Sequence, residues 1–151
     1  MPPSAFIGML AGAAQDCQRK TGIPASITLA QAALESGWGK EAAGNNLFGI
    51  KADRSWKGPT IDFRTTEHLG GQDVKLVGRF RRYDSWLASM VDHGKFLLEN
   101  PRYAKCFKQI DGPGWARELQ AAGYGTDPDY AKKLIEIMRG RNLAFYDQVK
   151  L

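Results

Sequence analysis

The sequence predicts an α+β fold in which a mainly helical lobe and a small β-hairpin lobe face each other across a cleft. Apolar residues recur at helical spacing near both ends of the chain, while two alternating segments flank Gly70-Gly71 in the middle. No internal repeat or linker interrupts this order of helices, one hairpin and helices. We therefore expect residues 1–151 to form a single domain, with its functional site between the two lobes.

The first predicted helix begins at Ser4 as N-cap and runs to about Lys20. Its apolar start, Ala5 to Ala14, is too short to span a bilayer and follows no positively charged segment. We therefore expect an amphipathic core helix, neither a signal peptide nor a membrane span. If no signal exists, an extracytoplasmic target must be reached by another export route.

A second helix is predicted from Pro24, which suits a first turn, to Ser36, with Gly37 in the left-handed position that ends many helices. Residues 39–59 are rich in glycine and asparagine and are typical of a loop.

A hairpin follows the loop. Residues 60–67 alternate, with Ile61, Phe63 and Thr65 on one face of a half-exposed strand. Gly70-Gly71 predicts the turn, and residues 74–83 predict the returning strand.

The last third of the chain is predicted to be helical. Asp84 or Ser85 caps a helix that Pro101 stops, a further helix begins near Pro113, and the last one ends at Gly140. The N-cap of this last helix is predicted at Thr126 or Asp127, before Pro128. The spacing predicts that the buried faces of these three helices include Leu87, Met90, Val91, Gly94, Leu97, Leu98, Trp115, Ala116, Leu119, Ala131, Leu134, Ile135 and Met138.

Composition excludes some classes of function. A hydrophobic fraction of 43% and a charged fraction of 25% are ordinary for a globular protein, which argues against a disordered or fibrous chain. The net charge of +5 favours an anionic partner or surface. No basic run with interleaved aromatics and no nucleic-acid-binding motif is present, so we expect no nucleic-acid partner. Bacterial envelope polymers are anionic as well.

The sequence offers no metal or cofactor site. Cys17 and Cys106 lack the spacing of metal ligands, and His68 and His93 lie far apart. We expect Cys17, on the apolar stripe of the first helix, to be a buried free thiol, although a disulfide with Cys106 stays open.

One carboxyl group lies where a negative charge is unfavourable. Glu35 falls in the last turn of the second helix, where unpaired carbonyls repel an anion by ~0.3–1 kcal/mol. Burial against Trp38 would raise its pKa further, which is how a protein makes a general acid from an ordinary carboxyl. Ile27, Ala30 and Leu34 form an apolar stripe on this helix, and a second stripe holds Thr28, Gln31, Glu35 and Trp38. The alternative is an exposed glutamate that pairs with Lys40 or caps a nearby group.

A glycosidase normally needs a second carboxyl group. Glu67 ends the first strand of the hairpin and could overhang a cleft, although an ordinary charge at a hairpin end fits this evidence equally well. The other candidates are Glu41, Asp53, Asp62, Asp73, Asp84 and Asp92.

The segment ITLAQAALESGWGKEAAGNNLFGIK, residues 27–51, resembles the signature of the bacterial N-acetylglucosaminidases of glycoside hydrolase family 73. The resemblance continues in order through WKG at 56–58, TTEHLGG at 65–71, FRRYDSWLASMVDH at 80–93, NPRYAK at 100–105 and AGYGTDPDYAKKL at 122–134. That family includes a domain of the flagellar rod-cap protein, autolysins and phage lysins. The resemblance implies a lysozyme-like fold and hydrolysis of the β-1,4 bond after N-acetylglucosamine in peptidoglycan.

The resemblance also implies catalytic residues. It makes Glu35 the general acid, Glu67 the second carboxyl, and Tyr124 or Tyr130 an assisting tyrosine. Beside the resemblance, Gln31, Trp38, Asn46 and Trp56 are candidates for contacts with the sugar, while Asn46 could instead order its loop and Trp38 could pack in the core.

Rival functions are a muramidase or lytic transglycosylase of the same fold, a wall-binding module without catalysis, and a nucleic-acid binder. We expect a monomer that acts on glycan strands in the periplasm or cell wall. It would be delivered as a phage lysin or as a secreted effector, the latter with a cognate immunity protein, or it would form part of a larger flagellar or autolytic protein.

Overall fold

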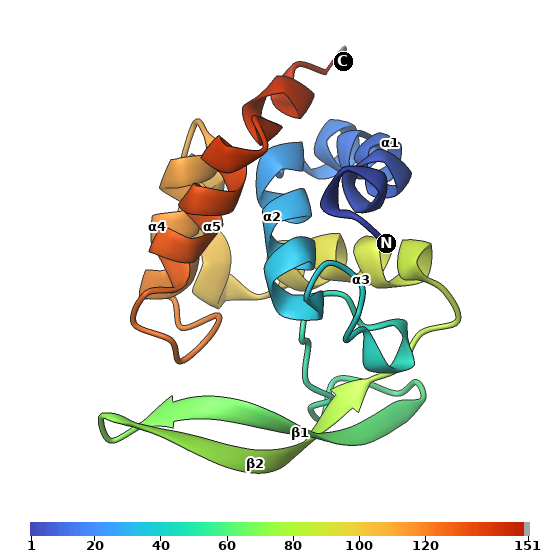
Figure 1. Ribbon diagram of the computed structural model, residues 1–151, viewed down its shortest axis with the longest axis vertical. Helices are drawn as coiled ribbons and strands as arrows, with labels where there is room; N and C mark the ends of the chain where they lie inside the picture. Colours follow the sequence, from blue (N-terminus) through green and yellow to red (C-terminus); the bar gives the residue numbers. More distant parts are fainter. Residues whose placement is uncertain (150–151) are drawn as a thin grey trace.

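The computed structural model describes residues 1–149 and has the predicted α+β architecture. Its α-helices are α1 (Pro3–Thr21), α2 (Ala25–Ser36), α3 (Trp86–Glu99), α4 (Gly112–Ala121) and α5 (Tyr130–Gly140). Antiparallel strands β1 (Thr60–Leu69) and β2 (Gln72–Arg81) form the hairpin, and short 3-10 helices are η1 (Ala43–Asn45), η2 (Pro101–Lys108) and η3 (Leu143–Asp147). The hairpin lies across one end of the helical lobe, with α2 in the middle of that lobe (Figure 1).

The N-cap of helix α1 lies two residues earlier than predicted, at Pro2 and not at Ser4. The Pro2 carbonyl accepts from the backbone amides of Ala5 and Phe6, both at 3.1 Å, and Pro3 suits the first helical position because it has no amide hydrogen to lose. The Ser4 side chain therefore lies inside the first turn, where no cap is needed.

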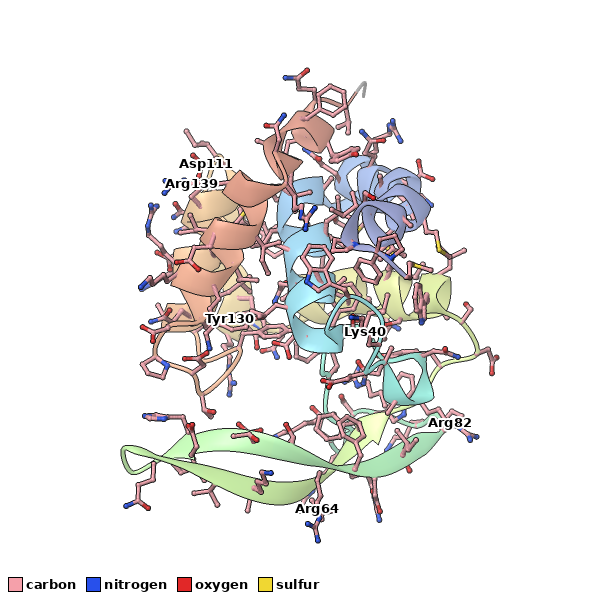
Figure 2. The ribbon with its side chains drawn as sticks, viewed as in Figure 1. Lys40, Arg64, Arg82, Asp111, Tyr130 and Arg139 are labelled. Carbon is pink, nitrogen blue, oxygen red and sulfur yellow. The ribbon has the colours of Figure 1, made fainter. Side chains whose placement is uncertain are left out.

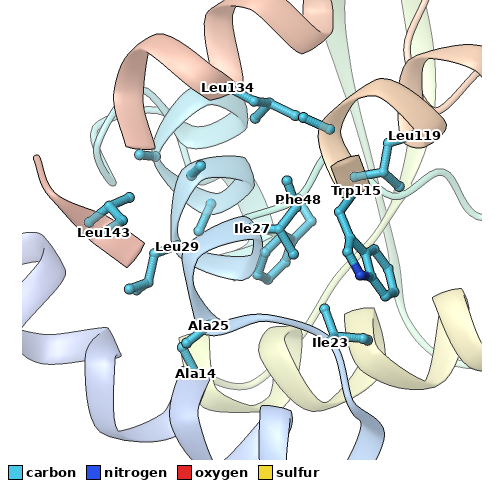
Figure 3. Packing of buried hydrophobic residues seen from close by; sticks show 14 of the residues in the cluster. Ala14, Ile23, Ala25, Ile27, Leu29, Phe48, Trp115, Leu119, Leu134 and Leu143 are labelled. Atoms are coloured by element: carbon cyan, nitrogen blue, oxygen red, sulfur yellow. The ribbon is translucent and has the colours of Figure 1, made fainter. Parts of the chain in front are cut away.

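Helix α2 is the centre of the core (Figure 3). Every residue from 25 to 33 is buried, as in a helix surrounded by other elements. The predicted division into a core face and a separate polar face is wrong at this point, because Thr28 and Gln31 have no exposed surface, while Leu34 is partly exposed. Gly37 ends the helix with φ 56°, as predicted.

The hairpin matches its predicted turn, but β1 is two residues longer than predicted, and β2 begins and ends two residues earlier than the predicted strand 74–83. Gly70 and Gly71 both have positive φ, which a two-residue type I′ turn requires. The strands run two residues closer to this turn at each side than the alternation indicates. The face that carries Ile61, Phe63 and Thr65 is partly buried, and Glu67 continues it, so the period of two aims Glu67 at the helical lobe.

Helix α3 has a narrower buried face than predicted. Ser85 is its N-cap and accepts from the amide of Ala88 over 3.1 Å. Leu87, Val91 and Leu98 are exposed by 59%, 66% and 52%, which contradicts their predicted burial. The helix packs through a stripe of smaller and polar residues, so fewer positions lie inside: the buried ones are Ser89, Met90, His93, Gly94 and Leu97.

Helix α4 is capped by Asp111, which accepts from Gly114 over 2.9 Å, but α5 begins at Tyr130, after the predicted cap at Thr126 or Asp127. Asp127 instead closes a turn by accepting from the amide of Asp129 over 2.8 Å. Gln120 then caps α5 from α4, since its Oε1 accepts from the amide of Ala131 over 2.8 Å. Because this cap comes from another helix, the residues around the start of α5 do not reveal it.

Both cysteines are free, and Cys106 is buried whereas Cys17 is only partly so. Among residues 1–149, no cluster of three histidine, cysteine or acidic side chains could hold a metal ion. No helix in the described part of the chain is long and apolar enough to cross a membrane.

Candidate active site

A cleft of about 1330 Å³ separates the helical lobe from the hairpin. It is lined by the end of α2, the loop that follows, the inner face of the hairpin, and the segment that enters α5. The structure brings together in this cleft the predicted site residues Glu35, Asn46, Glu67, Tyr124 and Tyr130. The remaining predicted ones, Gln31, Trp38 and Trp56, are not among the described residues that line it.

Glu35 is held at the floor of this cleft by the end of α2 and by the loop that returns beneath it. The loop backbone approaches so closely at Gly49 that a Cβ atom there would lie 2.9 Å from Glu35 Oε2. Gly49 also has φ 65°, which other residues rarely adopt. The sequence NLFGIK therefore needs a glycine at this point to leave room for the carboxyl group.

The environment of Glu35 favours its neutral form. Its pKa is raised from 4.5 to about 7: burial is the largest cause, a hydrogen bond from Tyr130 acts in the opposite direction, and the negative charges of Glu67 and Asp127 add to the rise. A carboxyl group with a pKa near 7 keeps its proton in a useful fraction of molecules at neutral pH. Glu35 can therefore act as a proton donor.

Trp38 does not supply this burial. Its ring meets Phe6 edge-on with centroids 5.9 Å apart, and the Arg141 guanidinium lies 5.4 Å from its centre. The αL conformations of Gly37 and Trp38 turn the chain away from the α2 axis immediately after Glu35. Trp38 thus packs against α1 and the end of α5, outside the cleft.

Glu67 enters the cleft from the hairpin. Its Oε2 accepts from the Thr126 hydroxyl over 2.8 Å, and its Oε1 lies 3.3 Å from Lys51 Nζ. Its side chain is only 16% exposed. The second carboxyl is thus held in place by one residue from each of the two loops that border the cleft.

The two tyrosines have different partners. Tyr130, at the start of α5 (Figure 2), is nearly buried, and its hydroxyl accepts from Gln31 Nε2 over 2.9 Å and is bonded to Glu35. The Tyr124 hydroxyl instead donates to the Phe48 carbonyl over 2.7 Å. Their rings stack with centroids 5.8 Å apart. Only Tyr130 is therefore hydrogen-bonded to the acid.

Asn46 organises the loop at the cleft. Its Nδ2 donates to the carbonyls of Ile50 and Arg81, each at 2.9 Å, while its Oδ1 accepts from the amides of Phe48 and Ile50, each at 3.2 Å. With its amide fully used in this way, Asn46 shapes the segment that carries Gly49.

Trp56 packs against the base of the hairpin. The Arg81 guanidinium lies 4.8 Å from its ring centre, the Tyr83 ring meets it edge-on, and its Nε1 donates to the Pro59 carbonyl over 2.8 Å. The same guanidinium is bonded to Asp92 over 2.9 Å. Trp56 thus covers a largely buried ion pair.

Sequence reasoning missed three residues that support the site. Lys51 and Thr126 hold Glu67, and His93 is bonded through Nε2 to Gln31 over 2.8 Å. His93 shares the helical phase of Met90 and Leu97, so its burial was open to prediction from the sequence. The partners of Lys51 and Thr126 lie on a different lobe and leave no pattern in the sequence.

A cleft between a helical and a β lobe, with a carboxyl acid of raised pKa on one side and a second carboxyl on the other, defines a glycoside hydrolase domain. A family model described as mannosyl-glycoprotein endo-beta-N-acetylglucosaminidase matches residues 11–143. The chain belongs to this glucosaminidase family, glycoside hydrolase family 73, and has its lysozyme-like fold.

Similar proteins agree with this assignment. Peptidoglycan hydrolase FlgJ of Escherichia coli is 41% identical over 142 residues, which cover 89% of this chain and 45% of that protein. Exo-glucosaminidase LytG of Bacillus subtilis is 38% identical over 152 residues, 95% and 53% of the two chains. The crystal structure of a peptidoglycan hydrolase mutant from Sphingomonas sp. A1 has a TM-score of 0.84 at 40% identity, covering 94% and 96%. The chain spans about half the length of these curated relatives.

Proposed function

We propose that this domain is an endo-β-N-acetylglucosaminidase that hydrolyses the β-1,4 bond after N-acetylglucosamine in peptidoglycan. The observation that carries the proposal is Glu35, whose pKa is raised to about 7 at the floor of a cleft that Glu67 faces from the other lobe. The names of the relatives, peptidoglycan hydrolase and exo-glucosaminidase, support peptidoglycan as the substrate and glucosaminidase activity, while the endo mode of cleavage is our proposal.

In the proposed reaction, Glu35 donates its proton to the departing glycosidic oxygen as the bond to C1 breaks. Either the 2-acetamido oxygen of the substrate attacks C1, with Glu67 orienting that group, or Glu67 activates a water molecule for direct attack. In the first route, water then breaks the new bond between C1 and the acetamido oxygen and gives its proton to the Glu35 carboxylate, so the anomeric configuration is retained; the second route inverts it. Proton NMR of the product in the first minutes of reaction separates them.

Among the other residues with a proposed role, Tyr130 assists through its bond to Glu35 and Asn46 by shaping the cleft. Gln31 is too deeply buried to touch a sugar, so its contribution would pass through Tyr130. Trp38 and Trp56 are assigned to packing, and the stacked ring of Tyr124 helps to form the wall of the cleft.

The experiment is digestion of purified sacculi by the parent and by Glu35→Gln, followed by mass spectrometry of the fragments. We expect reducing-end N-acetylglucosamine from the parent and a loss of rate of roughly 10²–10⁴-fold in the variant, the range for a general acid. Reducing or anhydro N-acetylmuramic acid would instead indicate a muramidase or a lytic transglycosylase.

Two outcomes would show that the domain is not a glycosidase. Equal wall binding by both proteins, with no release of fragments by either, would indicate a non-catalytic module. Strongly salt-dependent retention on DNA, without activity on sacculi, would indicate a nucleic-acid binder.

We place the site of action in the periplasm or cell wall, with the domain delivered by phage lysis or a secretion system or carried in a larger exported protein. A secreted effector would be paired with an immunity protein that blocks the cleft, and we expect a monomer. The genes beside this one distinguish these settings, because a holin indicates a phage and a small secreted protein indicates immunity.

A further inference from the structure

A chain of buried polar side chains extends from the acid into the core. The Tyr130 hydroxyl is bonded to Glu35, Gln31 Nε2 lies 2.9 Å from that hydroxyl, and Gln31 Oε1 lies 2.8 Å from His93 Nε2. Gln31 and His93 have no exposed surface, so neither can contact a substrate. Their chemistry must act on the site through Tyr130.

This chain has two self-consistent arrangements of its hydrogens. In the first, His93 Nε2–H donates to Gln31, the Gln31 amide donates to Tyr130, and the Tyr130 hydroxyl donates to Glu35. In the second, every donor and acceptor is exchanged, so that Gln31 is flipped and Glu35 gives its own proton to Tyr130. Only the first arrangement leaves the acid proton of Glu35 available to a leaving group.

His93 decides between the two arrangements. Its Nδ1 has no hydrogen-bond partner among the described residues, and Phe48 stacks on the ring at a centroid distance of 3.9 Å. Burial lowers the pKa of His93 to about 3, so the ring is neutral at working pH. In the second arrangement, Nδ1 would carry an unpaired buried N–H, which proteins avoid more strictly than an unpaired acceptor. The first arrangement is therefore favoured.

We infer that Gln31 and His93 are positioning residues that fix the direction of the Tyr130 hydrogen bond, so that Tyr130 donates to Glu35 and never accepts its proton. This inference rests on the proposed role of Glu35 as the general acid. It gives Gln31 a role in directing a hydrogen bond, where the sequence suggested contact with a sugar.

The direct test needs neither a substrate nor a variant. In the parent protein, ¹⁵N NMR of the His93 ring should show a protonated Nε2 and an unprotonated Nδ1 at neutral pH. A proton on Nδ1 would overturn the inference. Because this readout is independent of activity, it stands or falls separately from the glycosidase function.

The kinetic test replaces the hydrogen-bond donor of Gln31 that faces Tyr130 with an acceptor. In Gln31→Glu, the new carboxylate accepts hydrogen bonds from both His93 and Tyr130. The Tyr130 hydroxyl therefore donates to residue 31 and no longer to Glu35. We expect kcat to fall by roughly tenfold with KM unchanged, and the alkaline limb of the rate profile to move up by about one pH unit. The charged groups that line the cleft around Glu35 stay as they are in this variant: Lys40, Glu41, Lys51, Asp53, Arg64, Glu67, Lys75, Arg102, Asp127 and Lys133.

A double variant separates this effect from simple repulsion by the new charge. If Gln31→Glu acts through the hydroxyl, it should add no further shift in a Tyr130→Phe background. Equal shifts in both backgrounds would mean that residue 31 acts through space, and would overturn the inference. Thr28→Val, which changes another buried polar side chain of α2, should leave the alkaline limb of the rate profile at its parent pH.

A second pair of variants covers the case that Gln31→Glu does not fold. His93→Phe keeps a ring against Phe48 and loses the N–H donor, whereas His93→Gln keeps an N–H. We expect kcat to fall several-fold in His93→Phe and to recover in His93→Gln, with KM constant in both. Parent-like kcat in a folded His93→Phe would contradict the positioning role.

Discussion

The Thr126 hydroxyl donates to Glu67 Oε2 over 2.8 Å while it accepts from the backbone amide of His68 over 2.9 Å. One side chain of the helical lobe thus holds both the backbone and the carboxyl group at the far end of β1. The hairpin's other bonds to the rest of the described chain are at its base, through Arg79 and Arg81, so the position of Glu67 depends on this hydroxyl and on Lys51.

Replacing Thr126 by valine keeps the shape of the side chain and removes both bonds. We expect kcat/KM on sacculi to fall by about fivefold, the effect of one lost hydrogen bond of ~1 kcal/mol, with little change in thermal stability because the site is exposed. Thr126→Ser keeps the hydroxyl and should retain the rate. The explanation fails if the serine variant is as slow as the valine variant.

Glu35→Gln should stabilise the protein at alkaline pH. The pKa of Glu35 is raised from 4.5 to about 7 on folding, so between these values the folded state binds more protons and its stability falls as pH rises. Below pH 4.5 the carboxyl group has no such effect, and above pH 7 it destabilises the fold by about 3 kcal/mol. Urea unfolding at pH 4 and pH 8 should show the gain of the variant only at pH 8. Equal gains at both would contradict this assignment.

Removing a negative charge beside Glu35 should move the alkaline limb of the pH–rate profile to lower pH. Glu67 and Asp127 both raise the pKa of Glu35, so neutralising either makes its proton easier to lose. We expect Glu67→Gln to shift the limb of kcat/KM downward and also to lower the maximal rate. Asp127→Asn is the matched control, which should shift the limb and keep the rate at low pH. An unchanged limb in both variants would show that these charges do not act on Glu35.

Gly49→Ala should reduce activity as well as stability. The new methyl group would lie 2.9 Å from Glu35 Oε2, and the φ of 65° costs a side chain about 1–2 kcal/mol. Gly22→Ala has the same kind of strain, with φ 81° and open space around the new atom. We expect both variants to lose similar stability in thermal melts, and only Gly49→Ala to lose kcat. Loss of kcat in Gly22→Ala would point to a general effect of destabilisation.

Local chemistry predicted much of the fold. Gly37 and Gly70-Gly71 placed a helix end and a turn correctly, because positive φ is a property that the residue itself permits. The start of α5 was not predicted, because the Gln120 side chain caps that helix from α4. The exposed Leu87 and Val91 were also not predicted, since helical spacing does not say how wide a stripe the neighbouring elements cover.

The candidate site was predicted to a similar extent. Glu35 and Glu67 could be found from their places at the end of a helix and of a strand, and the structure places both in one cleft. The cause of the raised pKa of Glu35 differs from the predicted one, because Trp38 faces away from the cleft. His93 lies 62 residues from Gln31, and no pattern in the sequence connects a side chain to a partner at that distance.

Within the described part of the chain, Phe80 is the only buried hydrophobic residue between 60 and 81, and it lies outside the main core cluster. The hairpin therefore supplies one of the two carboxyl groups while contributing little to the free energy of folding of the helical lobe. Its base is bonded to the helical lobe through Arg81, but its outer end could move, or change in sequence or length, without the helices melting. Substitutions in one wall of the cleft can therefore alter which polymers the cleft accepts, with little loss of stability in the helical lobe.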